Sequence, residues 1–242
     1  MNMKLAHSLF SFHSKVPNIS PFIYHLSFII SSFLLSAAPA TAQMLMRDVF
    51  AAMPDSVLPM VTKNNRLDCI DFIENNMEAK VRNILDEYVT LEALTPDYAR
   101  FRTSASSLME LKLLPVNDST MVLCLVTTAQ TGEPDTPRRL EDSNIRFLKP
   151  DWSPRDSTST LPFSLPPLSE FMEEVPAADP NISAALRSLQ DFHPVRLALS
   201  PEAPILTATL QPAYLSIKER EAITPLLHPL TLHWNGFSFV KD

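Results

Sequence analysis

Glycine is nearly absent from this chain, whereas proline is abundant. Of 242 residues only Gly132 and Gly236 are glycine, and 22 are proline. Few backbone positions can therefore adopt the positive φ angles that glycine turns use, so proline has to interrupt the helices and strands. The scarcity also excludes a phosphate-binding loop, a dinucleotide fingerprint and the nucleophile turn of α/β-hydrolases, which need glycines at fixed spacing.

The first 42 residues are typical of an export leader. Lys4 and Lys15 are their only charged residues, an apolar run follows over residues 27–37, and Ala40-Thr41-Ala42 fits a cleavage site with small residues. The run is short for a transmembrane helix, which needs about 20 apolar residues. We expect a signal peptide over 1–42 and no stable membrane span after its removal. A membrane anchor with a long polar start is the alternative.

The predicted mature chain is acidic. Removing the two leader lysines leaves 18 basic against 27 acidic residues, a net charge of −9. Nucleic acid needs a basic face, and an anionic membrane surface attracts basic segments. We therefore expect no nucleic-acid partner.

Helical spacing begins directly after the leader. Apolar residues three and four apart predict a helix over 44–53 and a second over 65–77, with Asn64 or Asn65 as its N-cap. In the second helix we expect the apolar stripe to consist of Leu67, Ile70, Ile73 and Met77.

From residue 80 the pattern changes to that of strands. Residues 109–113 alternate, which predicts one apolar face and one solvent-exposed face carrying Glu110 and Lys112. Successive strands joined by short turns should pair as an antiparallel meander. The predicted strands are 81–85, 88–94, 99–103, 108–114, 120–128 and 144–148.

Residues 153–167 are rich in Ser, Thr and Pro and form the best candidate boundary. After them, Asp179-Pro180 predicts the start of a helix and Ser216 with Glu219 predicts a capping box. The predicted organisation is a leader (1–42), an N-terminal α+β half (43–152), a linker (153–167) and a C-terminal α+β half (168–242). Whether the two halves are a structural repeat stays open.

The chain ends in a predicted β-hairpin. Asn235-Gly236 is a typical two-residue turn between residues 230–234 and 237–240. In that register Trp234 lies opposite Phe237 and Leu232 opposite Phe239, and all four share one buried face. The fold class is therefore α+β: an antiparallel meander with helices on one face and a C-terminal hairpin.

The residues that carry most enzyme chemistry form no clear constellation. Asp68, Asp71 and Glu74 follow one helix flank, where acids are usually solvated, and Glu173-Glu174 is interpreted in the same way. His193, His228 and His233 have no metal-ligand spacing. We predict no catalytic, cofactor-binding or metal-binding residue and no cofactor.

Cys69 and Cys124 are the only cysteines, and both lie among apolar residues. They can pair in an oxidising compartment, or stay buried as free thiols that behave as small hydrophobic side chains.

Three segments resemble a known family. Met53-Pro54-Asp55-Ser56, Lys63–Asp68 and the Trp234-Asn235-Gly236 ending are similar to those of an exported protein family of unknown function from Bacteroidetes bacteria. The similarity covers most of residues 44–242. It implies export to the cell envelope and supplies no known activity.

The leading functional hypothesis is a non-enzymatic binding module in the periplasm or at the outer membrane, with an envelope protein or a glycan as partner. A hydrolase with an unrecognised site, using Asp68, Asp71 or His193, is the alternative. A structural accessory role at the outer membrane ranks third.

Overall fold

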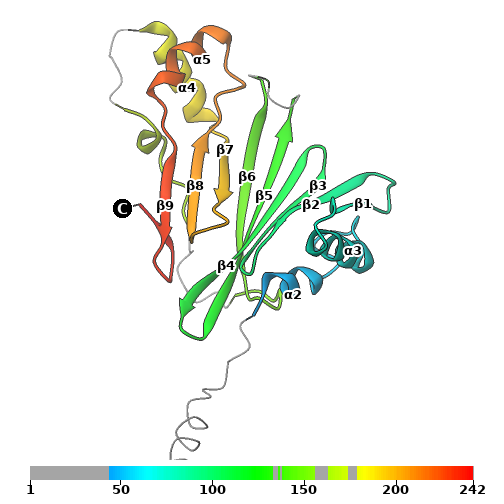
Figure 1. Cartoon of the computed structure of the whole chain (residues 1–242). Coiled ribbons are helices and arrows are strands. Elements are labelled where there is room, and N and C mark those ends of the chain that lie inside the picture. The colour runs from blue at the N-terminus through cyan, green and yellow to red at the C-terminus, as the bar shows by residue number, and fades with distance from the viewer. Residues whose placement is uncertain (1–43, 133–135, 137, 156–162, 174–178, 242) are drawn as a thin grey trace, which may run out of the picture. The chain divides into compact units, whose positions relative to one another are not determined.

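Six strands form an antiparallel meander in chain order, β1-β2-β3-β4-β5-β6 (Figure 1). The computed structural model describes residues 44–132, 136, 138–155, 163–173 and 179–241, which belong to the compact unit Met44–Asp242. The predicted leader and residues 156–162 of the predicted linker lie outside the described residues, so the boundaries drawn from the sequence stay predictions. The strands are β1 (Lys80–Arg82), β2 (Tyr88–Leu94), β3 (Tyr98–Ser104), β4 (Ser107–Asn117), β5 (Thr120–Thr131) and β6 (Leu140–Leu148).

A second antiparallel sheet follows, in the order β10-β9-β8-β7. Together with the helices it makes the protein α+β, as predicted. Asp179 caps α4 by accepting a hydrogen bond from the Asn181 N–H, and Ser216 caps α5 through the predicted capping box. The elements are η1 (Leu168–Phe171), α4 (Pro180–Asp191), β7 (Val195–Leu199), β8 (Ile205–Leu210), α5 (Ile217–Ile223), η2 (Thr224–Leu226), β9 (Leu230–Trp234) and β10 (Phe239–Val240).

Helices α2 (Met46–Ala51) and α3 (Lys63–Glu74) cover one face of the meander (Figure 1). The predicted stripe of α3 is right for Ile70 and Ile73, which pack against the core, and wrong for Leu67 and Met77, which are exposed. Arg66 and Cys69 are the other buried residues of the helix. Thr62, rather than Asn64 or Asn65, caps the helix, and Asn65 takes part in the cap from the third helical position. No described helix is both long and apolar enough to cross a bilayer.

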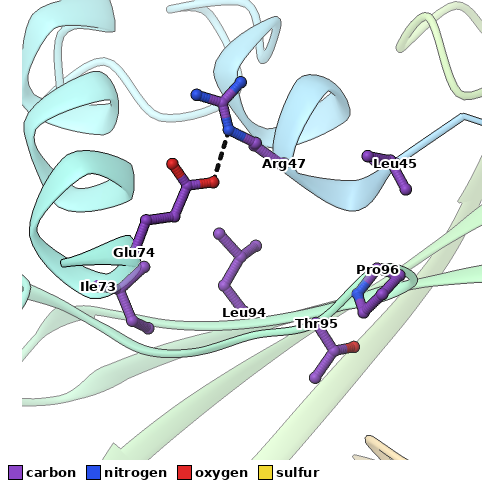
Figure 2. Close-up of a pocket in the computed structure, with 7 residues that line it drawn as sticks. All are labelled: Leu45, Arg47, Ile73, Glu74, Leu94, Thr95 and Pro96. Atoms are coloured by element: carbon purple, nitrogen blue, oxygen red, sulfur yellow. Dashed lines mark hydrogen bonds and ion pairs between the residues drawn. The ribbon is translucent and has the colours of Figure 1, made fainter. Parts of the chain in front are cut away.

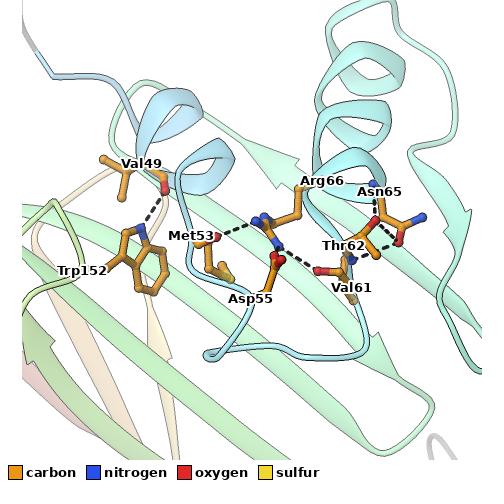
Figure 3. Close-up of polar contacts among 8 residues, drawn as sticks. All are labelled: Val49, Met53, Asp55, Val61, Thr62, Asn65, Arg66 and Trp152. Atoms are coloured by element: carbon orange, nitrogen blue, oxygen red, sulfur yellow. Dashed lines mark hydrogen bonds and ion pairs between the residues drawn. The ribbon is translucent and has the colours of Figure 1, made fainter.

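Arg66 holds the segment between the two helices in place (Figure 3). Its guanidinium group is buried and donates to the carbonyl oxygens of Met53, at 2.5 Å, and Val61, at 2.7 Å. It also donates to the Asp55 carboxylate at 3.0 Å. Buried carbonyl groups need partners, and this glycine-free loop obtains them from one side chain.

The other face of the meander packs against the second sheet. Leu114, Val122 and Val126 share one apolar cluster with Leu197 of β7 and Leu232 of β9. The edge strand β7 also bonds to β6: the Val195 N–H donates to Asp142 Oδ1 at 3.2 Å, and the Leu197 N–H donates to Ser143 Oγ at 3.0 Å. Side chains of β6 thus accept hydrogen bonds from the backbone N–H groups on the unpaired edge of β7.

The register predicted for the C-terminal hairpin is wrong. Trp234 pairs with Phe239 instead of Phe237, so the loop contains Asn235–Ser238. Asn235 Oδ1 accepts hydrogen bonds from the Phe237 and Ser238 N–H groups, which closes the longer loop. Phe237 is therefore exposed, whereas Trp234 and Phe239 are buried.

Candidate functional site

Charged side chains gather on the face of the meander that meets the second sheet. The strand register places Arg100 of β3 opposite Glu110 of β4, and Gln130 of β5 opposite Glu141 of β6. Side chains at matched positions of neighbouring strands point to the same side of the sheet. We define the arginine–glutamate face as Glu92, Arg100, Arg102, Glu110, Gln130, Arg139, Glu141 and Arg196.

Glu92 holds the first pair of arginines. It lies at the irregularity between Leu91 and Ala93 of β2. Its Oε2 is 2.7 Å from Arg100 Nε, and its Oε1 is 2.6 Å from Arg102 Nε. The three charged side chains are 28–34% exposed, so solvent reaches them while the ion pairs restrain them.

Glu141 lies between a second pair of arginines, although Arg196 Nε makes no hydrogen bond within the described residues. Its Oε1 is 3.2 Å from Arg139 Nε, and its Oε2 is 3.0 Å from Arg196 Nε. Arg196 belongs to β7, so this carboxylate joins the two sheets. Both arginine side chains keep about a quarter of their surface exposed, at 23% and 27%.

Gln130 connects the two arginine pairs. Its Oε1 accepts a hydrogen bond from Arg102 Nη1 at 3.2 Å, and its Nε2 donates to Glu141 Oε1 at 2.7 Å. One polar network therefore runs from β2 through β3, β5 and β6 to β7. A network with this many mutual contacts fixes the direction of each side chain.

Glu110 lies beneath this network and is almost fully buried. Tyr98 Oη donates a hydrogen bond to its Oε1 at 2.8 Å, and its Oε2 has no hydrogen-bond partner among the described residues. Burial raises the pKa of Glu110, although the bond from Tyr98 and the charges of Arg100 and Arg196 act in the opposite direction. The negative charge on this carboxyl group is thus disfavoured.

The prediction that Glu110 and Lys112 face solvent is wrong. Both are 1% exposed, because the second sheet covers this part of the face. Lys112 Nζ reaches Asp97 Oδ2 and the Pro201 carbonyl oxygen, each at 2.9 Å. Alternation of polar and apolar residues indicates two different faces, but it does not distinguish water from a second protein layer.

A small surface pocket is the second candidate (Figure 2). It has a volume of about 250 Å³ and lies between α2, the end of α3 and the β2–β3 turn. Arg47 Nε is 2.6 Å from Glu74 Oε1, so the two charged groups of the lining neutralise each other. The rest of the lining is mainly apolar: Leu45, Ile73, Leu94, Thr95 and Pro96.

The residues suggested for a hydrolase do not converge. Asp68 and Asp71 are exposed on α3, which packs against one face of the meander. His193 lies two residues before β7, which packs against the other face. Asp71 accepts a hydrogen bond from its helix neighbour Asn75, and Glu173 is exposed in a different segment.

The two cysteines also lie on opposite faces of the meander. Cys69 belongs to the cluster beneath the helices and Cys124 to the cluster between the sheets, and both are free thiols. Burial raises the pKa of Cys69 to about 12 and that of Cys124 well above its ordinary value. Within the described residues, no group of three or more His, Cys, Asp or Glu residues could hold a metal ion.

Sequence reasoning missed every residue of the arginine–glutamate face except Glu110, which it placed in solvent. One signal was present: Arg100 and Arg102 alternate with Ala99 and Phe101 along a strand, so two cations share one face. The glutamates that hold them are distant in sequence, and only the strand register identifies them.

Comparisons with known proteins give a family and a related fold. No curated protein matches the chain. A domain of an uncharacterized protein from Porphyromonas gingivalis W83, a member of the Bacteroidetes, is similar in structure, with a TM-score of 0.66 and 25% sequence identity over 81% of this chain and 98% of that domain. The family model for proteins of unknown function termed DUF3256 matches residues 39–239. The chain therefore belongs to the DUF3256 family of proteins of unknown function.

Proposed function

We propose that this protein is an exported, non-enzymatic binding module of the cell envelope, and that it binds a saccharide through the arginine–glutamate face. The observation that carries the proposal is the continuous network of partly exposed arginines held by Glu92 and Glu141. Restrained side chains lose little conformational entropy when a ligand binds.

The composition of the face favours a saccharide over a protein partner. The core of a protein interface is usually enriched in aromatic residues, Met and Arg and depleted of Glu. The arginine–glutamate face consists of Arg, Glu and Gln, which suit the hydroxyl groups of a sugar.

The geometry favours binding over catalysis. Both oxygens of Glu92 and of Glu141 contact arginine Nε atoms, so neither carboxylate is directed at a reacting group. Proton transfer requires a side chain within hydrogen-bond reach of the substrate proton.

Export is supported by the leader pattern and by the extent of the family match. The match begins at residue 39, close to the predicted cleavage after Ala42. The family thus shares the part of the chain that follows the leader.

The export half of the proposal is tested in the protein's own cells. Fractionation followed by mass spectrometry should find a protein that begins near Gln43 in the periplasmic or outer-membrane fraction. An intact leader on protein in the cytoplasmic fraction would contradict export.

The binding half is tested on a saccharide microarray. The wild type should bind at least one saccharide, and the double variant R102Q/R196Q should lose that signal. R47Q is the matched control, because it removes one arginine charge on the opposite face of the meander. Signal that survives in R102Q/R196Q, or no signal for the wild type, would overturn the proposal.

A further inference from the structure

The arginine–glutamate face carries more positive than negative charge. Four arginines face three glutamates, and one of these, Glu110, is buried where its charge is disfavoured. The chain as a whole has a formal net charge of −7. The face is therefore opposite in sign to the protein that carries it, and such a local field attracts anions.

The arginines are already positioned to bind carboxylates. In both pairs one glutamate carboxylate lies between two guanidinium groups and contacts the Nε atom of each. A guanidinium group has five N–H donors, so contact through Nε leaves the Nη donors of these arginines for further acceptors. Arg102 uses Nη1 for Gln130.

The two pairs lie side by side along one network, because Gln130 touches both Arg102 and Glu141. A ligand that carries a single negative group can use only one pair. A chain with a carboxylate on successive units can use both, and two linked contacts raise the affinity of the whole.

We infer that the arginine–glutamate face selects acidic saccharides, whose carboxylate groups bind to the Arg100–Arg102 pair and the Arg139–Arg196 pair. This inference rests on the proposed function and names the ligand class for the same site. A neutral saccharide provides hydroxyl groups alone, which make weaker hydrogen bonds to arginine than a carboxylate does.

The test is isothermal titration calorimetry of the full-length protein with trigalacturonic acid and with its methyl ester, which has the same rings without the charges. The acid should bind at least about tenfold more tightly than the ester, since each charge-assisted bond adds more than a neutral one. The affinity for the acid should fall as sodium chloride is raised, because salt screens the attraction.

Three variants test how the arginine–glutamate face binds the acid. R102Q should weaken binding of the acid about tenfold or more, and R47Q should leave it unchanged. E92Q removes a carboxylate that competes for Arg100 and Arg102, so it should strengthen binding of the acid several-fold. Circular dichroism spectra and thermal unfolding midpoints verify that each variant is folded.

The outcomes separate the two proposals. If acid and ester bind equally and R102Q weakens both, the inference fails while the binding function of the face stands. If E92Q lowers the unfolding midpoint and does not strengthen binding, the network acts as a scaffold and the inference is overturned. If neither ligand binds, the inference is overturned as well. If the wild type also binds no saccharide on the microarray, the proposed function is overturned too.

Discussion

Arg66 shows how one side chain can replace the glycine turns that this chain lacks. The loop between α2 and α3 contains no glycine, and two of its carbonyl groups point inward to the guanidinium group (Figure 3). A buried carbonyl without a partner costs about 1–3 kcal/mol. The loop conformation therefore depends on this residue.

R66M should lower the free energy of unfolding by about 3 kcal/mol, because it removes the partners of the Met53 and Val61 carbonyls at nearly constant volume. Urea denaturation monitored by circular dichroism measures the change. D55N should cost under about 1 kcal/mol, since the Asp55 side chain is 69% exposed. If R66M and D55N lowered the free energy of unfolding equally, the bonds to the two carbonyl groups would not be the main contribution of Arg66 to stability.

Glu110 should make the stability of the protein depend on pH. Its pKa is raised in the folded state above the ordinary value of 4.5, so the folded protein holds this proton more tightly than the unfolded chain. The contribution of Glu110 to stability is then largest below pH 4.5 and is lost as the pH rises through the folded-state pKa.

E110Q keeps an oxygen that accepts the Tyr98 bond and cannot ionise. The unfolding free energy of E110Q minus that of the wild type should therefore grow as the pH rises from about 4.5, until it reaches a plateau above the folded-state pKa. Urea denaturation at a series of pH values measures this difference. A difference that stays constant, or that shrinks with rising pH, would show that the folded state favours the charged carboxylate.

At the scale of elements, the C-terminal hairpin is part of the core between the sheets. The centroid of the Phe239 ring lies 5.2 Å from that of the Trp234 ring and 6.3 Å from that of the Phe147 ring of β6. Trp234 Nε1 also donates to the Pro115 carbonyl oxygen at 2.6 Å, which ties the hairpin to the end of β4.

F239A should lower the free energy of unfolding by about 3–5 kcal/mol, the usual range for removing a buried phenylalanine. F237A should change it by less than about 0.5 kcal/mol, because Phe237 is 46% exposed. Thermal or urea unfolding of the two variants decides between the observed register and the two-residue turn. A loss from F237A as large as that from F239A would instead support the two-residue turn, in which both rings are buried.

Local signals in the sequence were sufficient for many elements. The caps of α4 and α5 and the strands β2, β7, β8 and β9 depend on neighbouring residues, so spacing and cap chemistry predict them. The hairpin register depended on how the Asn235 side chain bonds to the loop, and sequence preference alone favoured the shorter turn. Contacts between distant segments carry no local signal: the burial of Glu110 follows from the second sheet, and the arginine pairs follow from strand register.

At the scale of the whole unit, the meander is covered on both faces by different parts of the chain. The helices that precede it cover one face, and the second sheet that follows it covers the other (Figure 1). Residues of β4 and β5 contribute to both apolar clusters, so loss of either layer exposes the same strands. We expect the two layers to unfold together.

The two tryptophans report on the two layers separately. Trp152 belongs to the cluster beneath the helices and donates to the Val49 carbonyl oxygen, and Trp234 belongs to the cluster between the sheets. W152F and W234F each keep one tryptophan. In each variant, the urea midpoint from the fluorescence of that tryptophan should equal the urea midpoint from circular dichroism. Fluorescence and circular dichroism midpoints that differ within one variant would indicate two separately unfolding parts.

The location of binding is tested most directly by nuclear magnetic resonance of the arginine Nε–Hε groups during titration with trigalacturonic acid. The signals of Arg100, Arg102, Arg139 and Arg196 should shift together and saturate at one ligand concentration. The signals of buried Arg66 and of Arg47, which lines the pocket in Figure 2, should stay in place. Shifts confined to Arg47, or no shift at any arginine, would contradict the assignment of the arginine–glutamate face as the binding site.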